Sequence, residues 1–339
     1  MFSHPLAPLG FTEDRAAELA AFGDPALEPG RVVRIDRGLA TVLASDGEHR
    51  LPTRPRLTPT VGDWVALRIG EGLASILPRR TELVRRAGDR RDERQVVAAN
   101  VDRILIARAL DLAISLTRIE ALLAIAWESG AEPLVLLTKA DRCADIEAAR
   151  AEVAAVAYDV RVLCLSVPDG TGVEELRDAV SGRTVVLLGE SGAGKSTIAN
   201  LLAGREQLAT GPVRDDGQGR HTTTHRELVA LPGGGAIIDS PGIREAAYWG
   251  TGDGISRTFG DLEELAMACR FSDCGHCSEP GCALRAAVAA GSLDDARIEA
   301  WRHALRERAW LAQRLDKRAA SEERSRWKRQ SRSLRRDTW

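Results

Sequence analysis

The sequence feature that most constrains the fold is a glycine-rich run, Gly189 to Ser196, which matches the pattern G-x-x-x-x-G-K-[ST] throughout. An apolar segment precedes the run and a helix-like segment, 196–202, follows it. Glycines in such a turn let backbone N–H groups curl around phosphate oxygens, and the helix N-terminus adds a partial positive charge. A chance glycine-rich turn is the alternative, but it requires neither flanking element. The run therefore predicts a phosphate-binding loop, in which Lys195 reaches the phosphates and the Ser196 hydroxyl binds Mg²⁺.

The residues around this loop alternate between apolar runs and helical patterns. The apolar runs read as buried strands at 103–107, 133–138, 161–166, 184–189 and 236–240. Helical patterns lie between them at 116–128, 145–157 and 173–180. Such alternation predicts a parallel sheet covered by helices on both faces. The sequence contains no internal repeat.

The remaining segments have different characters. Residues 1–30 are loop-rich with one short helix predicted over 12–22, and residues 79–94 are dense in arginine and read as a basic loop or linker. Between them, short β-prone runs predict a small barrel or sandwich; these runs are 31–35, 39–44, 64–69 and 74–77. After residue 254 strand signals stop, and a helical pattern covers 294–318.

Two short motifs follow predicted strands that precede the loop in sequence. Thr138-Lys139-Ala140-Asp141 resembles the guanine-recognition motif N-K-x-D, in which the carboxylate accepts two hydrogen bonds that only guanine donates. Thr138 stands where an Asn amide usually tethers the loop, and its hydroxyl is a partial substitute. Ser166-Val167 resembles the S-A motif whose backbone contacts the base. An ordinary helix N-cap at Asp141 is the alternative, which the neighbouring phosphate loop disfavours.

Two further motifs follow the loop. Asp239-Ser240-Pro241-Gly242 fits D-x-x-G, in which the carboxylate holds Mg²⁺ through water and the glycine N–H contacts the γ-phosphate. A threonine triplet, 222–224, lies where GTPases carry the threonine that binds Mg²⁺ and senses the γ-phosphate. The alternative for the D-x-x-G motif is a turn that ends a strand, and the alternative for the threonine triplet is an ordinary edge strand. Because the base-reading motifs precede the phosphate loop, the domain is predicted to be circularly permuted, with the D-x-x-G strand last.

Four of the six cysteines fall within residues 269–282. Thiol and imidazole ligands at short spacing suit tetrahedral Zn²⁺, and a closed set of four indicates a structural site. The residues offer five candidates for four places: Cys269, Cys274, His276, Cys277 and Cys282. A reduced loop without metal is the alternative, and spacing alone leaves the choice between His276 and Cys277 open.

Charge and hydropathy limit the partners. No run of apolar residues is long enough to span a membrane, and residues 1–10 lack a basic-then-apolar leader. We therefore expect a soluble, cytoplasmic and monomeric protein. The net charge of −2 conceals a tail, from Trp301, that carries +8. This tail and the basic segment 79–94 are suited to neutralising RNA phosphates, and Trp310, Trp327 and Trp339 to stacking on bases. An amphipathic helix packed on the preceding domain is the alternative for 301–318.

The motifs together resemble the RsgA (YjeQ) family of GTPases, which depend on the small ribosomal subunit. The resemblance rests on the pieces named above together with Val61-Gly62-Asp63-Trp64-Val65, Asn100-Val101-Asp102 and residues 219–228. It implies an N-terminal OB-fold barrel, a permuted P-loop GTPase domain and a C-terminal helical zinc domain. It also implies hydrolysis of the β–γ phosphoanhydride of GTP, stimulated by the 30S subunit during its late maturation, with rRNA, GTP and GDP as partners.

The resemblance also assigns residues. The family pattern C-x4-C-x-H-x5-C selects one structural Zn²⁺ on Cys269, Cys274, His276 and Cys282. His221 matches the suggested catalytic histidine and Thr223 the switch threonine. Ile243 occupies the place of a water-orienting Gln, so another group must orient the water, and His221 is our hypothesis. Mg²⁺ is expected on Ser196, Thr223 and Asp239.

The nucleotide is then expected to contact Thr138, Lys139, Ala140, Asp141, Ser166, Val167, Gly189, Glu190, Ser191, Gly192, Ala193, Gly194, Lys195, Ser196, Thr197, Asp239 and Gly242. The expected domains are an extension (1–30), the barrel (31–85), the GTPase domain (95–250), the zinc domain (255–318) and a basic tail (319–339). Two rival classes are a P-loop ATPase or small-molecule kinase, disfavoured by Asp141, and a nucleic-acid-binding module with a vestigial site, disfavoured by the intact Lys195 and Asp239.

Overall fold

The computed structural model describes residues 3–36, 38–54, 57–86, 94–204, 226–239 and 253–313. The chain divides into two compact units, residues 1–247 and 248–339. Within the described ranges, no helix combines the length and the apolar character that crossing a bilayer requires.

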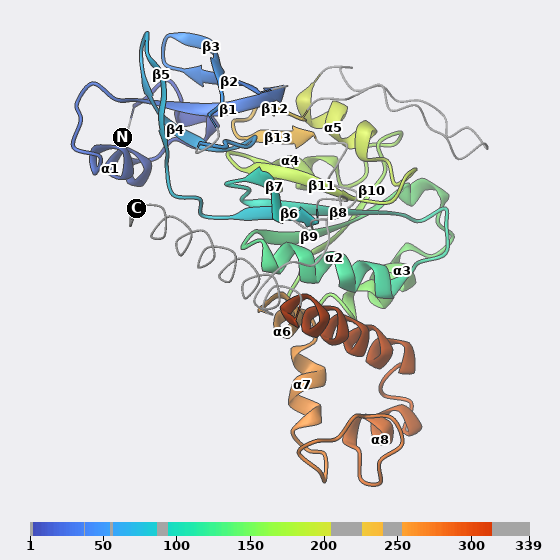
Figure 1. Ribbon diagram of the computed structural model, residues 1–339. Helices are drawn as coiled ribbons and strands as arrows, with labels where there is room; N and C mark the ends of the chain where they lie inside the picture. The colour runs from blue at the N-terminus through green and yellow to red at the C-terminus, as the bar shows by residue number, and fades with distance from the viewer. Residues whose placement is uncertain are drawn as a thin grey trace, which may run out of the picture. The chain divides into compact units, whose positions relative to one another are not determined.

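The centre of the first unit is the parallel part of an 11-stranded sheet, in which five parallel strands are followed by one antiparallel neighbour (Figure 1). The parallel strands occur in the spatial order β10 (Val162–Leu165), β9 (Glu132–Thr138), β8 (Arg103–Ala109), β11 (Thr184–Gly189) and β13 (Ala236–Asp239). β12 (Arg226–Ala230) runs antiparallel beside β13. Every apolar run predicted as a buried strand is therefore a strand of this sheet, and β13 is its last strand in sequence.

Helices cover both faces of this sheet, as the alternation predicts. They are α2 (Leu116–Glu128), the 3₁₀ turn η2 (Ala140–Arg142), α3 (Ile146–Ala154), α4 (Val173–Val180) and α5 (Lys195–Ala203). Side chains alternate along β8, so Ile104 and Ile106 join one buried cluster with α2 and α3. Leu105, between them, joins a second cluster with α4 and α5. Packing on both faces holds the strands in place, and with them the strand ends at which the predicted loops lie.

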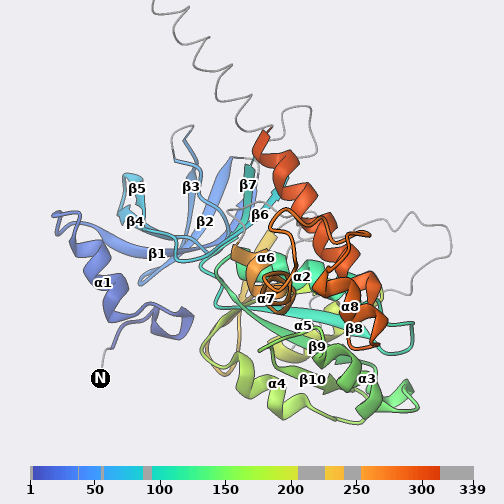
Figure 2. The same cartoon turned by 90° about the horizontal axis from the view of Figure 1, so that it is seen from below.

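Five antiparallel strands precede these in the chain and continue the same sheet, because the first of them pairs with β12 at Arg34 and Ile35. They are β1 (Glu28–Asp36), β2 (Leu39–Ala44), β3 (Gly47–Pro52), β4 (Trp64–Arg68) and β5 (Gly72–Ile76), and a small apolar core that includes Val32, Val42 and Val65 lies among them. β3 is absent from the predicted set because its residues alternate between half-buried and exposed and carry little apolar signal. A helix, α1 (Glu13–Ala20), and a 3₁₀ turn, η1 (Ala7–Leu9), precede these strands. Figure 2 shows the five strands and β10 at opposite ends of the unit, in agreement with the strand order.

The prediction of a basic loop or linker over 79–94 is wrong where the structure describes it. β6 (Glu82–Arg86) pairs with β7 (Arg94–Ala99) as an antiparallel two-stranded sheet. Leu83 and Val97 are buried, and their apolar signal was hidden by the surrounding arginines. Arg79 is also no free cation, because its guanidinium bonds the buried Asp63 carboxylate at 2.7 and 2.8 Å. Residues 87–93 lie outside the described ranges.

A buried polar junction joins the five-stranded region to the strand that carries the phosphate loop. Arg31 of β1 lies over the Trp64 ring and donates to the Thr184 hydroxyl at 3.1 Å. Asp102 accepts a hydrogen bond from the Thr184 N–H at 2.6 Å, so both contacts meet at the first residue of β11. Asn100 donates to Gly62 O at 3.0 Å and accepts from Arg15 at 2.6 Å. The two motifs shared with the family around Asp63 and Asn100 thus belong to this junction.

The second unit is helical where it is described. It contains α6 (Asp253–Thr258), α7 (Gly260–Ala266), α8 (Ala283–Ala289) and a helix over 295–313. Ile255, Phe259, Leu284, Ile298 and Trp301 pack together with Cys282 in its core. The helix predicted over 294–318 is confirmed up to residue 313, beyond which the chain lies outside the described ranges.

Candidate nucleotide and metal sites

The predicted nucleotide motifs meet at the carboxyl ends of neighbouring strands. Gly189 ends β11, Asp239 ends β13, Thr138 ends β9 and Ser166 follows β10. Because β10, β9, β8, β11 and β13 are consecutive and parallel, these ends form one edge of the sheet. Open α/β sheets bind ligands at this edge.

The glycine-rich loop has a backbone that only glycine adopts easily at three places. Gly189, Gly192 and Gly194 have φ angles of +138°, +81° and +78°. At Gly189 a Cβ atom would lie 2.2 Å from Ala107 O on β8, so a side chain cannot be accommodated there. α5 begins at Lys195 without a side-chain cap, and the Lys195 ammonium lies over the loop, where it donates to Gly189 O at 2.8 Å and to Glu190 O. Backbone N–H groups, a helix N-terminus and an ammonium therefore converge, as a phosphate site requires.

Thr138 connects the predicted base-reading segment to this loop. Its hydroxyl is buried and donates to Ala193 O at 3.0 Å, with Arg108 O a further 3.4 Å neighbour. The hydroxyl thus makes the tether for which an Asn amide is the usual group. Thr138, which departs from the N-K-x-D pattern, therefore still connects the base-reading segment to the phosphate loop.

Lys139 is held at the same edge by a residue that the sequence did not single out. Its backbone is in the left-handed region, with φ of +57°, and its ammonium bonds Asp111 at 2.7 Å. Arg142 lies 3.4 Å from the same carboxylate. The hydrogen bond from Lys139 holds the pKa of Asp111 below its ordinary value, so Asp111 stays ionised beside both cations. The one feature of the sequence that could have identified Asp111 is its position two residues beyond the end of β8, at the edge where ligands bind.

Asp141 and Ser166 come together from two different strands. The Ser166 hydroxyl donates to Asp141 Oδ1 at 2.9 Å, and Arg142 Nε lies 3.8 Å from Asp141 Oδ2. Ser166 is buried, so the contact fixes the Asp141 carboxylate in orientation. The acceptor pair that would read guanine is thereby presented next to the tethered phosphate loop.

Other predicted residues differ in their accessibility. Ser191, Gly192 and Thr197 are exposed, and Ser196 and Asp239 are half-buried. Asp239 lies opposite Glu227 in the pairing of β13 with β12. His221, Thr223 and Gly242 lie outside the described residues, as does Ile243.

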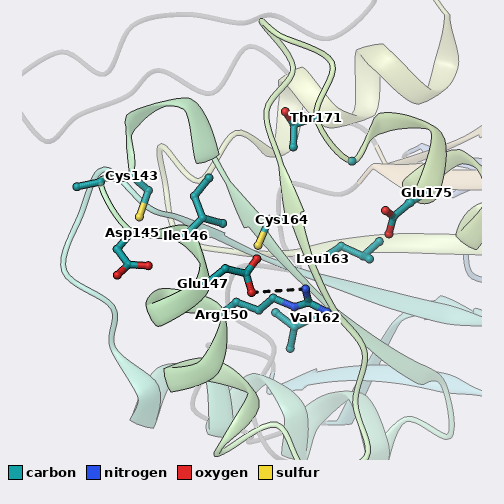
Figure 3. A pocket seen from close by; sticks show the side chains of 12 residues that line it. Cys143, Asp145, Ile146, Glu147, Arg150, Val162, Leu163, Cys164, Thr171 and Glu175 are labelled. Carbon is teal, nitrogen blue, oxygen red and sulfur yellow. Dashed lines mark ion pairs between the residues drawn. The ribbon is translucent and has the colours of Figure 1, made fainter.

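A separate cavity of about 580 Å³ lies among α3, β10 and the start of α4 (Figure 3). Cys143 precedes α3 and Cys164 lies on β10, and both contribute to its lining. Glu147 and Arg150 of α3 form a 4.0 Å ion pair there. None of the predicted nucleotide-binding residues lines this cavity, so it is distinct from the edge that carries their motifs.

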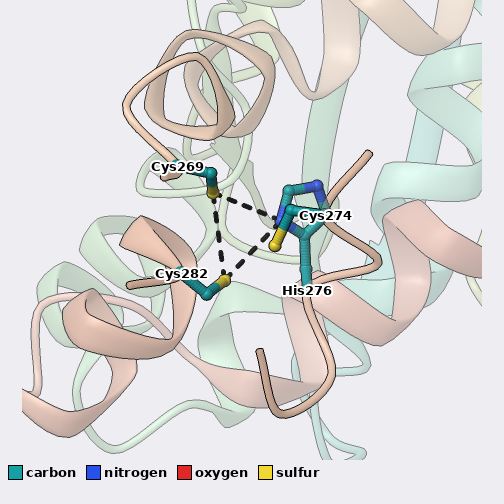
Figure 4. A group of neighbouring side chains, drawn as sticks. All are labelled: Cys269, Cys274, His276 and Cys282. Carbon is teal, nitrogen blue, oxygen red and sulfur yellow. Dashed lines mark hydrogen bonds between the residues drawn. The ribbon is translucent and has the colours of Figure 1, made fainter. Parts of the chain in front are cut away.

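In the second unit, Cys269, Cys274, His276 and Cys282 turn their ligand atoms toward one point (Figure 4). All four ligand atoms lie within 4.8 Å of one another. The Cys269–Cys282 sulfur separation is 4.0 Å, and His276 Nδ1 is 3.6 Å from each of these sulfurs. Tetrahedral Zn²⁺ with ordinary bond lengths requires edges of about 3.8 Å between sulfurs and about 3.6 Å between sulfur and nitrogen. The donor set therefore fits a tetrahedral metal ion.

The surroundings of this group also suit a metal. Backbone N–H groups of Ala283 and Arg285 donate to the Cys269 and Cys282 sulfurs at 3.3 and 3.5 Å. Burial lowers the pKa of His276, which favours the neutral ring that a metal binds. Cys277 is not in the group: it is exposed and lies 2.7 Å from an Arg302 nitrogen. The geometry thus favours His276 over Cys277, the choice that spacing left open.

The loop between the second and fourth ligands is organised by Glu279. Its carboxylate accepts hydrogen bonds from the N–H groups of Gly275, Cys277 and Ser278 at 2.8 to 3.0 Å. These backbone hydrogen bonds lower the pKa of Glu279 to about 2. This role was not predicted, because a lone glutamate in a loop has no distinctive sequence pattern.

Comparison with known proteins agrees with this geometry. A family model described as RsgA GTPase matches residues 76–249, and a model described as ABC transporter matches residues 178–322, which include the glycine-rich loop. Proteins named small ribosomal subunit biogenesis GTPase RsgA match nearly the whole chain. The relative from Streptomyces coelicolor is 44% identical, with 96% of this chain and 92% of the relative covered. That from Opitutus terrae is 42% identical, with 95% of each covered.

Two solved structures have the same fold. YjeQ from Thermotoga maritima matches with a TM-score of 0.59 and 23% identity, covering 84% of this chain and 99% of that one. YloQ, described as a circularly permuted GTPase, matches with a TM-score of 0.57 and 20% identity, covering 85% and 96%. The sequence order of the motifs, the order of the strands and these matches lead to one conclusion. The chain belongs to the RsgA GTPase family and has the fold of a circularly permuted GTPase.

Proposed function

We propose that this protein hydrolyses GTP while bound to the small (30S) ribosomal subunit and acts in the late maturation of that subunit. The observation that carries the proposal is the assembled edge of the sheet, where the Asp141–Ser166 pair and the phosphate loop are joined by Thr138. Relatives about 40% identical over nearly their whole length carry names that state a role in small-subunit biogenesis. An ATPase or small-molecule kinase needs no such carboxylate beside the base.

The bound nucleotide is placed by the residues of this edge. Asp141 accepts the two guanine donors, Lys139 lies along the base, and the loop from Gly189 to Thr197 surrounds the phosphates. Ser196 and Asp239, with Thr223, are the proposed Mg²⁺ ligands. When bound, Mg²⁺ neutralises charge on the β- and γ-phosphate oxygens. GDP is held by the same base and loop contacts.

His221 and Thr223 are the proposed catalytic residues. Ile243 has no group that orients water, so His221 is proposed to place the attacking water for in-line displacement at the γ-phosphorus. The water oxygen bonds the γ-phosphorus while the bond to the β–γ bridging oxygen breaks. Inorganic phosphate then leaves with the water oxygen, and GDP keeps the bridging oxygen, the water's protons being shared between phosphate and solvent. Replacing His221 with alanine is expected to lower subunit-stimulated turnover at least tenfold without changing GDP affinity, and an unchanged rate would remove His221 from this role.

We propose one structural Zn²⁺ on Cys269, Cys274, His276 and Cys282, since the donors fit its geometry. The five-stranded region over 31–85 is proposed to be an OB-fold barrel that binds rRNA, followed by the GTPase domain over 95–250. The zinc domain then covers 255–318, and the basic tail over 319–339 adds phosphate contacts. An assembly factor of this kind acts in the cytoplasm, as a single copy on each subunit.

The order of the segments indicates how hydrolysis promotes release. β13, which ends at Asp239, is the last strand of the sheet, and the helices of the second unit follow it in the chain. GTP is proposed to favour an ordered arrangement of the segment after Asp239 and thus the subunit-bound state. Loss of the γ-phosphate removes that preference and favours release.

The direct test is GTP hydrolysis by the full chain with and without small ribosomal subunits, across a salt series. We expect slow turnover alone and a strong stimulation by subunits that weakens as salt rises, because phosphate contacts are screened. Negligible turnover in the presence of subunits would favour the alternative, a nucleic-acid-binding module whose nucleotide site is vestigial.

A further inference from the structure

A carboxylate stands within the phosphate loop itself. Glu190 directly follows Gly189, and its backbone carbonyl accepts a hydrogen bond from the Lys195 ammonium. A negative side chain in a loop that binds a polyanion is unfavourable, since like charges at short range repel strongly where water is partly excluded. Something in the structure must therefore offset the charge of Glu190.

Two arginines from outside the loop bind this carboxylate. Arg108, at the end of β8, donates to Glu190 Oε2, and Arg118, in the first turn of α2, lies 3.0 Å from Oε1. The Arg108 side chain is 10% exposed, whereas that of Arg118 is 65% exposed. The two guanidinium groups more than balance the single negative charge, and they hold it on the side of β8 and α2.

Arg108 also contacts the site through its backbone. Its carbonyl is the 3.4 Å neighbour of the Thr138 hydroxyl, which donates to Ala193 in the middle of the loop. A second side-chain N–H of Arg108 donates to Ala113 O, so the guanidinium is anchored on the segment that leads into α2. Arg108 is therefore connected to the loop in two ways, directly at Glu190 and through the Thr138 hydroxyl at Ala193.

We propose that Arg108 is a positioning residue for nucleotide binding, which holds Glu190 away from the phosphates and cancels its charge, with Arg118 as an exposed second cation. This inference rests on the proposed function, because the anion that Glu190 would repel is the nucleotide. Removing Arg108 leaves the carboxylate partly buried and less compensated beside the phosphates, and nucleotide affinity falls. Removing the charge of Glu190 at the same time restores the affinity.

The chain offers a matched control on the same strand. Arg103, the first residue of β8, is also buried, and it bonds Glu132 at 2.5 Å and Ala179 O at 2.7 Å. It lies at the end of β8 opposite Arg108, away from the phosphate loop. If Arg108 served stability alone, Arg108→Met and Arg103→Met would have the same consequences for nucleotide binding.

The experiment is a titration of the whole 339-residue chain, purified with zinc present, with a fluorescent GDP analogue. The proteins compared are the wild type, Arg108→Met, Glu190→Gln, Arg108→Met/Glu190→Gln and Arg103→Met. We expect about a tenfold weaker Kd for Arg108→Met and recovery of most of that loss in the double variant. Arg103→Met should have the wild-type Kd, and Glu190→Gln a tighter one. Equal Kd values for Arg108→Met and the wild type would overturn the inference, as would a double variant no better than Arg108→Met.

The same titration distinguishes failure of the proposed function from failure of this inference. Failure of the wild type to bind GDP would refute the proposed function, and the inference with it, whereas wild-type binding with an unaffected Arg108→Met refutes the inference alone. If Arg108→Met does not fold, Arg118→Met carries the test on an exposed side chain. It is expected to weaken binding about threefold and to do so less at high salt. An unchanged Kd for Arg118→Met at low salt, together with weaker binding by Glu190→Gln, would overturn the inference.

Discussion

The two candidate sites are held in place by different means. The nucleotide site lies on a sheet whose two faces are both buried, so the positions of its loops follow from two apolar clusters, to which the phosphate loop itself contributes Ala193. In the second unit the core is small, and Cys282, a proposed metal ligand, is itself one of its buried residues. α6, α7 and α8 have only six or seven residues each.

This difference indicates what each site needs. Backbone turns and buried hydrogen bonds, such as that of Thr138 with Ala193, form the nucleotide edge without any help from the ligand. Short helices with few buried residues have little stability of their own, and in such units the metal supplies part of the folding free energy. We therefore expect loss of the nucleotide to leave the first unit folded, and loss of the metal to unfold the second.

The largest effect is expected from Cys282→Ser. The change removes both a buried thiol of the core and a proposed zinc ligand, so bound zinc should be lost and the amide protons of 253–313 should exchange rapidly with solvent. Metal analysis and hydrogen exchange measure both. GDP affinity should stay within about twofold, because the first unit keeps its core.

Cys277→Ser is the matched control for that variant. Cys277 lies in the same loop but is exposed and outside the four-donor group, so zinc content and hydrogen exchange should match the wild type. If the second unit of zinc-free Cys282→Ser were stable and exchanged its amide protons slowly, the second unit would not need the metal to fold, and this difference between the units would not exist.

A smaller effect is expected from Thr138→Val, which keeps the shape of the side chain and removes the hydroxyl. The lost hydrogen bond to Ala193 O is worth about 1 kcal/mol, which corresponds to about a fivefold weaker GDP affinity. Thr138→Ser, which keeps the hydroxyl, is the control and should bind GDP like the wild type. Equal affinities for the valine and serine variants would mean that the phosphate loop needs no tether to the base-reading segment.

The smallest effect is expected from Asp111→Asn. The Asp111–Lys139 pair is partly exposed, so its loss should weaken GDP binding by about two- to threefold. Because Lys139 lowers the pKa of Asp111, the ionised pair is complete above the ordinary carboxyl pKa of about 3.9 and is lost only as pH falls through the lowered value. The ratio of wild-type to variant affinity should thus be constant from pH 5 to pH 8, and a ratio that changes across this range would contradict the assignment.

Much of the first unit was predictable because its signals are local. Buried parallel strands are nearly continuous apolar runs, so the strand Thr184–Gly189 has the predicted bounds. The helix Leu116–Glu128, predicted from its helical pattern, also has the predicted bounds. The phosphate loop and the D-x-x-G strand were found from fixed patterns of residue types. The cysteine spacing limited the metal ligands to five candidates, but only the folded loop separated His276 from Cys277.

What the sequence did not predict depends on contacts between distant segments. The hairpin of β6 and β7 was hidden because arginines surround its apolar residues. In the folded chain these arginines are paired, as Arg94 is with Glu82 across the hairpin and the preceding Arg79 is with Asp63. Asp111 and the Arg108–Glu190 pair have no local pattern, since their roles arise only when β8, β9 and β11 lie side by side. Single charged residues acquire such roles from topology, which composition and periodicity do not report.

We propose above that the edge of this sheet is a guanine-nucleotide site, with Asp141 as the residue that reads the base. The most direct measurement is the affinity of the full chain for GDP and for ADP, repeated with Asp141→Asn. We expect GDP to bind at least a hundredfold more tightly than ADP. The variant should lose most of this preference because an amide N–H faces the guanine donors. Equal affinities of the wild type for GDP and ADP, or an unchanged preference in Asp141→Asn, would contradict this proposal.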